Sequence, residues 1–173
     1  VLEMGCGTAR NMVLLARRQP QAMYYGIDAS SEMLVTAQKK AERAGLQDRM
    51  VLRQCLAEEV SYQDTFGLDE PFDWIFFSYS LSMIPTWKQS IQTAMDNLKP
   101  GGWIYIVDFW DQAKLPGWFQ VILKQWLALF HIRHEPELLD YLHTLAQQNG
   151  HSIQVDSIFG QYALKTRLQK PAI

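Results

Sequence analysis

The sequence lacks the features of a membrane-spanning, disulfide-stabilised or nucleic-acid-binding protein. No run of about 18 apolar residues is free of charged side chains, which excludes a membrane-spanning helix. Only two cysteines are present, Cys6 and Cys55, too few for a disulfide framework or a cysteine metal site. The formal net charge of −2 creates no positive field, so we expect no nucleic-acid partner.

What remains is a composition typical of one globular domain. The 173 residues are 48% hydrophobic and 20% charged, enough for a sizeable core. No linker, repeat or low-complexity segment divides the chain, so we predict a single domain over 1–173. Unpaired thiols suit a reduced cytoplasm, where we expect the protein to reside. The first strand begins almost at Val1, and we expect residues upstream of it to be missing.

Strand-like and helix-like segments alternate along the chain. We expect strands at 1–4, 23–28, 50–54, 72–79, 103–109, 152–159 and 161–168, the last two joined by a turn at Gly160. We expect helices at 11–18, 31–45, 87–98, 118–130 and 136–149, the third stopped by the sequence KPGG. This alternation predicts an α/β, Rossmann-like doubly wound fold with a mostly parallel seven-stranded sheet and an antiparallel C-terminal hairpin. Segment 72–79 (FDWIFFSY) is nearly all apolar, which indicates a strand covered on both faces.

The first turn, in VLEMGCGTAR, is the strongest local signal. In open parallel sheets ligands bind beyond the carboxyl ends of the strands, and glycines there let the backbone approach a ligand closely. Gly5 and Gly7 meet this requirement. The dinucleotide fingerprint G-x-G-x-x-G needs a third glycine at position 10, where this chain has Arg10, so a nucleotide-dependent oxidoreductase is disfavoured.

Asp28, at the end of the second strand, is the second candidate ligand-binding residue. A carboxylate there can accept two hydrogen bonds from a ribose diol, with Ala29 and Met33 packing on an adenine ring. The alternative is that Asp28 caps the following helix.

The segments VLEMGCGTAR and YYGIDAS resemble motifs of the class I S-adenosylmethionine-dependent methyltransferases, which show [DE]-x-G-x-G-x-G before their first helix. Here Ala9 stands at the third glycine, and Leu56-Ala57 stands where the family often has Asp-Ala, which leaves adenine to backbone groups or Glu58. The resemblance implies S-adenosylmethionine as cofactor and a lid formed by the missing upstream residues. The implied cofactor-binding residues are Glu3, Gly5, Cys6, Gly7, Asn11, Asp28, Ala29, Met33, Leu56, Ala57 and Ser78.

Two longer segments distinguish this chain from methyltransferases in general: FFSYSLSMIPTWKQSI (76–91) and IVDFWDQAKLPGWFQVILKQWLALFHI (106–132). They resemble the N-methyltransferases of bacterial betaine-lipid synthesis, which trimethylate the amine of diacylglyceryl-homoserine. The resemblance implies a class EC 2.1.1 enzyme, a lipid-amine substrate and peripheral contact with a membrane. The apolar segment 118–130 suits either a lipid-facing helix or a buried one.

Aromatic and polar residues after the fourth and fifth strands are the candidates for the acceptor side. A quaternary ammonium product is best recognised by aromatic faces, for which Tyr79, Trp110 and Trp118 are candidates; ordinary core packing is the alternative for the tryptophans. Asp108 and Asp111 could attract the substrate ammonium. Tyr79 and His131 are the catalytic candidates, with His131 as a base or a partner for the lipid carboxylate. His131 and His134 lack further ligands at suitable spacing, so we expect no metal.

Two other functions fit the same fold. One is a small-molecule or quinone methyltransferase, and the other is a module that binds S-adenosylmethionine without turnover. The sequence indicates no oligomeric state.

Overall fold

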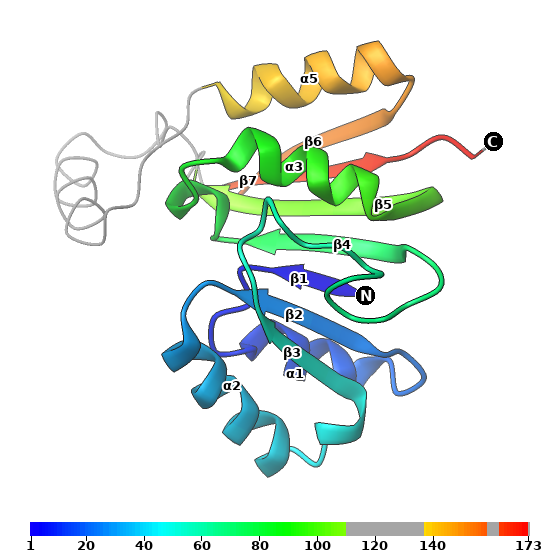
Figure 1. Cartoon of the computed structure of the whole chain (residues 1–173). Helices are drawn as coiled ribbons and strands as arrows, with labels where there is room; N and C mark the ends of the chain where they lie inside the picture. The colour runs from blue at the N-terminus through cyan, green and yellow to red at the C-terminus, as the bar shows by residue number, and fades with distance from the viewer. Residues whose placement is uncertain (110–136, 159–162, 173) are drawn as a thin grey trace, which may run out of the picture.

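The computed structural model describes residues 1–109, 137–158 and 163–172, which form one sheet with helices on both faces (Figure 1). The seven strands follow the order β3-β2-β1-β4-β5-β7-β6. Their bounds are β1 Leu2–Met4, β2 Tyr24–Asp28, β3 Met50–Gln54, β4 Phe72–Ser78, β5 Leu98–Phe109, β6 Ser152–Ile158 and β7 Ala163–Gln169. Strands β1 to β5 pair in parallel, whereas β7 pairs antiparallel with both β5 and β6. The predicted fold class is therefore confirmed.

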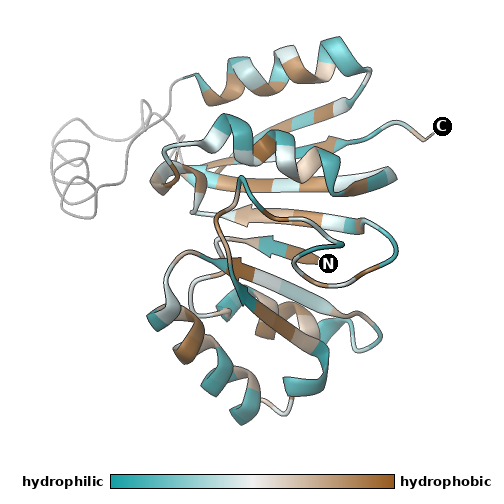
Figure 2. Ribbon diagram, viewed as in Figure 1, coloured by the Kyte–Doolittle hydropathy of each residue, from teal (hydrophilic) through white to brown (hydrophobic). Residues whose placement is uncertain are grey.

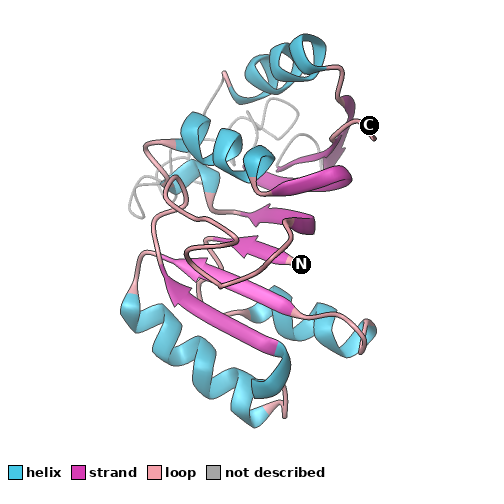
Figure 3. Ribbon diagram, turned by 45° about the vertical axis from the view of Figure 1, so that its right-hand side comes forward, coloured by secondary structure: helices cyan, strands magenta, loops and turns pink. Residues whose placement is uncertain are grey.

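The helices divide between the two faces of the sheet (Figure 3). They are α1 Arg10–Arg18, α2 Ser31–Arg43, α3 Trp87–Asp96 and α5 Leu138–Asn149, with short 3-10 helices η1 Gln47–Arg49 and η2 Leu81–Met83. Buried residues of α1 and α2 form one core cluster with Tyr24 and Met50, and those of α3 and α5 form a second with Ile75 and Ile104. Figure 2 shows hydrophobic stretches along several strands and a mixture of hydrophilic and hydrophobic residues along the helices.

The start of β5 differs from the prediction. The KPGG sequence, expected to end a helix before a strand at 103, lies inside β5, which already pairs with β4 through Leu98 and Phe72. The side chain of Asn97 closes α3 by donating to the carbonyl oxygens of Thr93 and Val60, at 2.8 and 3.0 Å. Since this cap turns the chain within one residue, no loop separates α3 from β5.

Strand β4 also ends earlier than predicted, at Ser78 rather than Tyr79. Tyr79 has a φ of 54°, in the left-handed region that bulky residues rarely adopt. Its N–H donates to the carbonyl oxygen of Val107 at 2.7 Å, so the strained residue is held against the end of β5. The chain leaves the sheet at this point and begins a new loop.

Two predicted features cannot be compared with the structure. The apolar helix at 118–130 and the turn at Gly160 both lie outside the described residues. Among the helices that the structure does describe, none is long and apolar enough to cross a membrane.

Candidate functional site

A pocket of about 480 Å³ opens at the carboxyl edge of the sheet, where β1, β2 and β4 end. Its lining includes all eleven residues predicted to bind the cofactor, together with Tyr79. These residues come from four separate turns of the chain. The fold therefore places residues that are far apart in the sequence around a single pocket.

The glycine turn after β1 forms the floor of this pocket. The N–H groups of Gly5 and Cys6 both donate to the carbonyl oxygen of Ile27, at 2.9 and 2.8 Å, which ties the turn to the end of β2. Gly5 has a φ of 75°, and a Cβ atom there would lie 2.6 Å from the Cβ of Ser80. Glycine is required at this position by both backbone conformation and space.

Ala9, which replaces the third family glycine, precedes α1 with a φ of 55°. A left-handed alanine costs about 1–2 kcal/mol, and here its buried methyl group packs in the core with Met12 and Val13. The departure from the motif therefore lies at the residue that precedes α1 and not in the turn formed by Gly5 and Gly7.

Asp28 closes the same turn from the neighbouring strand. Its Oδ2 accepts a hydrogen bond from the N–H of Gly7 at 2.7 Å, and its Oδ1 accepts one from the N–H of Ser30 at 2.9 Å. The cap of α2 is Ser30, whose hydroxyl accepts from the N–H of Met33 at 3.3 Å, so the capping alternative for Asp28 is wrong. Each Asp28 oxygen keeps further acceptor capacity toward the pocket, because an ionised carboxylate offers about four lone-pair sites.

Glu3 places a second carboxyl group in the pocket, and it is only 2% exposed. Its Oε1 accepts from the side-chain amide of Asn11 at 3.0 Å, while its Oε2 has no hydrogen-bond partner among the described residues. Burial raises the pKa of Glu3 to about 8, against the opposing effects of the Asn11 amide and the nearby Met12 N–H, and the charge of Asp28 adds to the rise. A buried carboxyl group with an unused oxygen favours a ligand that brings a positive charge and N–H donors.

The segment after β4 forms the opposite wall. Ser78, Tyr79 and Ser80 begin it, and the Ser80 hydroxyl donates to the carbonyl oxygen of Met4 at 2.9 Å. Sequence reasoning missed the rest of the wall and two residues of the glycine turn, namely Met83, Ile84, Pro85, Thr86, Thr8 and Arg10. Their position directly after a strand that ends at the carboxyl edge was the available signal.

The segment after β3 contains the departure from the family motif and lines the same pocket. Leu56, which takes the family's Asp position, is 44% exposed and lines the pocket together with Ala57 and Glu58. Glu58 is thus placed where it could accept from an amino group.

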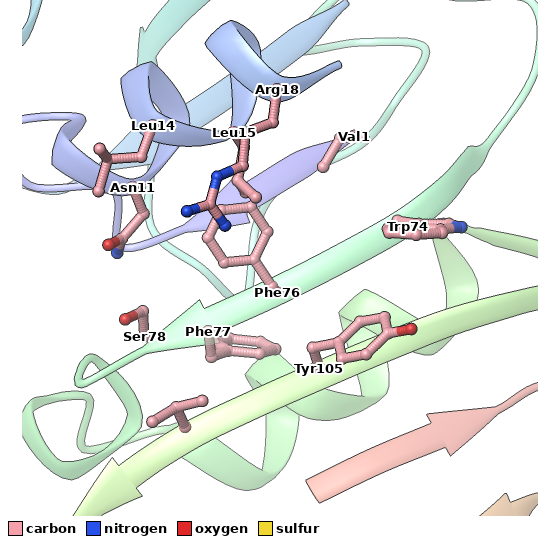
Figure 4. A pocket seen from close by; sticks show the side chains of 11 residues that line it. Val1, Asn11, Leu14, Leu15, Arg18, Trp74, Phe76, Phe77, Ser78 and Tyr105 are labelled. Atoms are coloured by element: carbon pink, nitrogen blue, oxygen red, sulfur yellow. The ribbon is translucent and has the colours of Figure 1, made fainter. Parts of the chain in front are cut away.

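A second, apolar groove of about 440 Å³ adjoins this pocket, between α1 and the strands β4 and β5 (Figure 4). Asn11 and Ser78 line both cavities. The groove exists because the described residues leave this face of β4 open: Trp74 is 41% exposed and Phe76 is partly exposed, whereas Ile75 on the other face is buried. The described residues thus cover only one face of β4, and the cover predicted for the other face stays a prediction, because residues 110–136 lie outside the described part of the chain.

Some predicted site residues cannot be placed. Trp110, Trp118 and His131 lie outside the described residues, as does Asp111. Asp108 is described but is buried and bonded to backbone N–H groups, so it does not present its carboxylate to the pocket. Within residues 1–109, 137–158 and 163–172, no group of three or more His, Cys, Asp or Glu could hold a metal ion.

Comparison with known proteins gives a family match. Residues 1–158 match the methyltransferase domain family. The chain is 32% identical to the phosphatidylethanolamine N-methyltransferase of Cereibacter sphaeroides over 67% of this chain and 53% of that protein. It is 31% identical to the trans-aconitate 2-methyltransferase of Deinococcus radiodurans over 59% of this chain and 34% of that protein.

The fold is shared with solved structures of low sequence identity. The plantazolicin methyltransferase BpumL, crystallised with a triazolic desmethylPZN analogue and SAH, superposes with a TM-score of 0.77 at 15% identity, over 98% of this chain and 76% of that one. The chain spans about half the length of the first curated relative and about a third of the second.

Proposed function

Since the chain belongs to the methyltransferase domain family, we propose that it is an S-adenosylmethionine-dependent N-methyltransferase that methylates the amine of a lipid head group. Diacylglyceryl-homoserine, converted to its trimethylated betaine, is the substrate we propose. The observation that carries the lipid class is the similarity to a phosphatidylethanolamine N-methyltransferase across two thirds of the chain.

The pocket at the carboxyl edge fits this cofactor chemically. The cofactor supplies an activated sulfonium methyl group. Asp28 would accept from the two ribose hydroxyls, and Glu3, with its unused buried oxygen, would face the ammonium of the amino acid part. Ala29, Met33, Leu56 and Ala57 would surround the adenine, and Tyr79 would stand on the acceptor side with Ser78. The task left to these residues is to align the amine and exclude water.

The raised pKa of Glu3 predicts that cofactor binding releases a proton at pH 7. A carboxyl group with a pKa of about 8 is mostly protonated at this pH, and a cationic partner favours its ionised form. We expect close to one proton to be released per cofactor bound, declining above pH 8, where the group is already ionised. Calorimetry in buffers of different ionisation enthalpy measures this number directly. Equal binding enthalpies in all buffers would contradict the role of Glu3, and Glu3→Gln should abolish the buffer dependence.

The acceptor can be tested with vesicles. Radiolabelled cofactor should transfer its methyl group to vesicles that contain diacylglyceryl-homoserine, and mass spectrometry should detect the mono-, di- and trimethylated lipids. Vesicles of phosphatidylethanolamine and a soluble amine such as homoserine serve as comparison acceptors. Transfer to the soluble amine alone would exclude the lipid substrate while leaving the methyltransferase assignment intact.

The apolar groove supports a substrate with a hydrocarbon part, because it meets the cofactor pocket at Asn11 and Ser78. We predict that Leu14→Asp, at the groove and 51% exposed, lowers kcat/KM for the lipid about five- to thirty-fold, the loss of about 1–2 kcal/mol of apolar contact. Val35→Asp is the matched control, because Val35 is 55% exposed on α2 and lines neither cavity. Kinetic assays on lipid and soluble amine separate the effects. Equal losses in the two variants would exclude the groove.

A small carboxylic acid is the second candidate acceptor, favoured by the similarity to a trans-aconitate 2-methyltransferase. An O-methyl acceptor needs no proton removal from an ammonium. A panel of small acids in the same radiolabel assay distinguishes this function from the first.

A further inference from the structure

Asp108, near the end of β5, is a buried carboxylate that the proposed chemistry does not use. It is 1% exposed, and each of its two oxygens accepts a hydrogen bond from a backbone N–H group. Oδ2 accepts from Ser82 at 3.0 Å, and Oδ1 accepts from Phe109 at 2.8 Å. Ser82 lies 26 residues earlier, in the short helix η2, so the carboxylate joins two segments that are distant in the sequence.

The segment that Asp108 reaches is the acceptor-side wall of the pocket, residues 79–86. Tyr79, Ser80 and Met83 to Thr86 line the pocket, whereas Ser82 points its backbone N–H away toward β5. Hydrogen bonds fix the first half of the wall to the sheet, among them those from Tyr79 N–H to Val107, from the Ser80 hydroxyl to Met4, and from Ser82 N–H to Asp108. The bond to Asp108 is the one nearest to the pocket-lining residues 83–86.

We propose that Asp108 is a positioning residue, which fixes the wall 79–86 at the distance from the glycine turn that cofactor binding and methyl transfer require. Its effect is transmitted through the backbone of Ser82 and not through contact with substrate or cofactor. The proposal rests on the proposed function only in that residues 83–86 are taken to contact the cofactor or the acceptor.

Burying a carboxylate only to accept hydrogen bonds from two N–H groups is energetically unfavourable, because a neutral acceptor has a smaller desolvation penalty. Moving a carboxylate out of water is unfavourable unless hydrogen bonds or an opposite charge compensate it. Here N–H groups supply the hydrogen bonds, and no cation among the described residues pairs with Asp108. What the carboxylate adds is two strong acceptors pointing in different directions from a single rigid strand. Burial raises the pKa of Asp108, and the hydrogen bonds from Ser82 and Phe109 oppose this by favouring the ionised form. Hydrogen bonds to an ionised carboxylate are roughly twice as strong as neutral ones, which suits a fixed wall better than a mobile loop.

The test compares Asp108→Asn with Asp156→Asn, an exposed aspartate on β6. The amide keeps the size of Asp108 but offers one acceptor instead of two, so one N–H group loses its partner. We expect hydrogen exchange of residues 79–86 to accelerate at least tenfold while β1 and α1 stay unchanged, and the affinity for S-adenosylhomocysteine to fall about tenfold. With an active acceptor, kcat should fall more than the KM for the lipid changes. Asp156→Asn should alter none of these values.

Three results would overturn the proposal. One is unchanged exchange of residues 79–86 in a folded Asp108→Asn variant; another is uniformly faster exchange over the whole core with unchanged affinity, which indicates a purely structural role. The third needs no variant: a Ser82 amide in the wild-type protein that exchanges as fast as an open loop is not held by Asp108. Failure of the wild-type chain to bind S-adenosylhomocysteine would instead refute the proposed function and leave the exchange data as the test of Asp108.

Discussion

Replacing Asp28 with alanine is expected to weaken the binding of S-adenosylmethionine on the order of 100-fold or more. Hydrogen bonds to a charged acceptor contribute about 1.5–3 kcal/mol each, and two such bonds to the ribose correspond to at least this loss. Isothermal titration at a temperature where the variant remains folded measures the change. Asp48→Ala, the same substitution at an exposed aspartate in η1, should leave the affinity unchanged.

Asp28 also holds the turn, which offers a second explanation for a loss of affinity. Its oxygens accept from the N–H groups of Gly7 and Ser30, so alanine leaves both donors without this partner. A cofactor analogue without the two ribose hydroxyls separates the two effects. If Asp28 binds the diol, the analogue binds the wild-type protein weakly and Asp28→Ala reduces its affinity little further. If the variant loses the same factor for both ligands, Asp28 acts through the turn alone, and the ribose role is refuted.

The sheet and the edge that carries the pocket could be predicted because their signals are local. Short apolar segments alternate with amphipathic helices, and Gly5, Gly7 and Asp28 stand at the ends of the first two strands. Parallel strands bring their carboxyl ends to one edge, so the ends of β1 and β2 had to meet there. The structure places all eleven predicted cofactor residues around one pocket, and their binding roles stay predictions that the experiments above test.

Features that depend on distant pairs could not be predicted in this way. The hydrogen bond from Ser82 to Asp108 joins residues 26 positions apart, and nothing in either local sequence indicates it. The sequence shows Asp108 only as a polar residue at a strand end that could attract the substrate ammonium, whereas in the structure its carboxylate binds backbone N–H groups. The prediction that KPGG ends a helix before a separate strand was wrong for a related reason. Pairing with β4 and the cap by Asn97 override the local preference of proline and glycine for a turn.

The face of β4 toward α1 shows what an apolar composition cannot predict, namely which elements pack against a strand. An apolar run such as FDWIFFSY indicates that a strand has apolar neighbours, but it does not identify them. The described helices α3 and α5 cover one face, and the other forms the groove beside α1. The surface that supports a hydrocarbon-bearing substrate is thus the face of β4 that the described residues leave open.

Gly5→Ala is expected to have the largest effect on stability of the substitutions considered. A left-handed φ costs a non-glycine residue about 1–2 kcal/mol, and forcing extra volume into a packed site costs about 1–3 kcal/mol more. The clash is direct, because the new Cβ would lie 2.6 Å from the Cβ of Ser80. We expect a loss of about 2–5 kcal/mol in the free energy of unfolding, measured by urea denaturation, together with weakened cofactor binding.

Gly45→Ala isolates the backbone part of this cost. Gly45 has a φ of 66°, and a Cβ atom there would meet no atom within 4 Å, so only the conformational penalty of about 1–2 kcal/mol applies. The steric part is isolated by Ser80→Gly, which removes the atom that Gly5→Ala would strike. The double variant should therefore be more stable than the sum of the two single losses predicts, by about 1–3 kcal/mol. Strict additivity would mean that Gly5 is needed for its backbone conformation alone, and that the contact between the glycine turn and the wall 79–86 does not fix the width of the pocket.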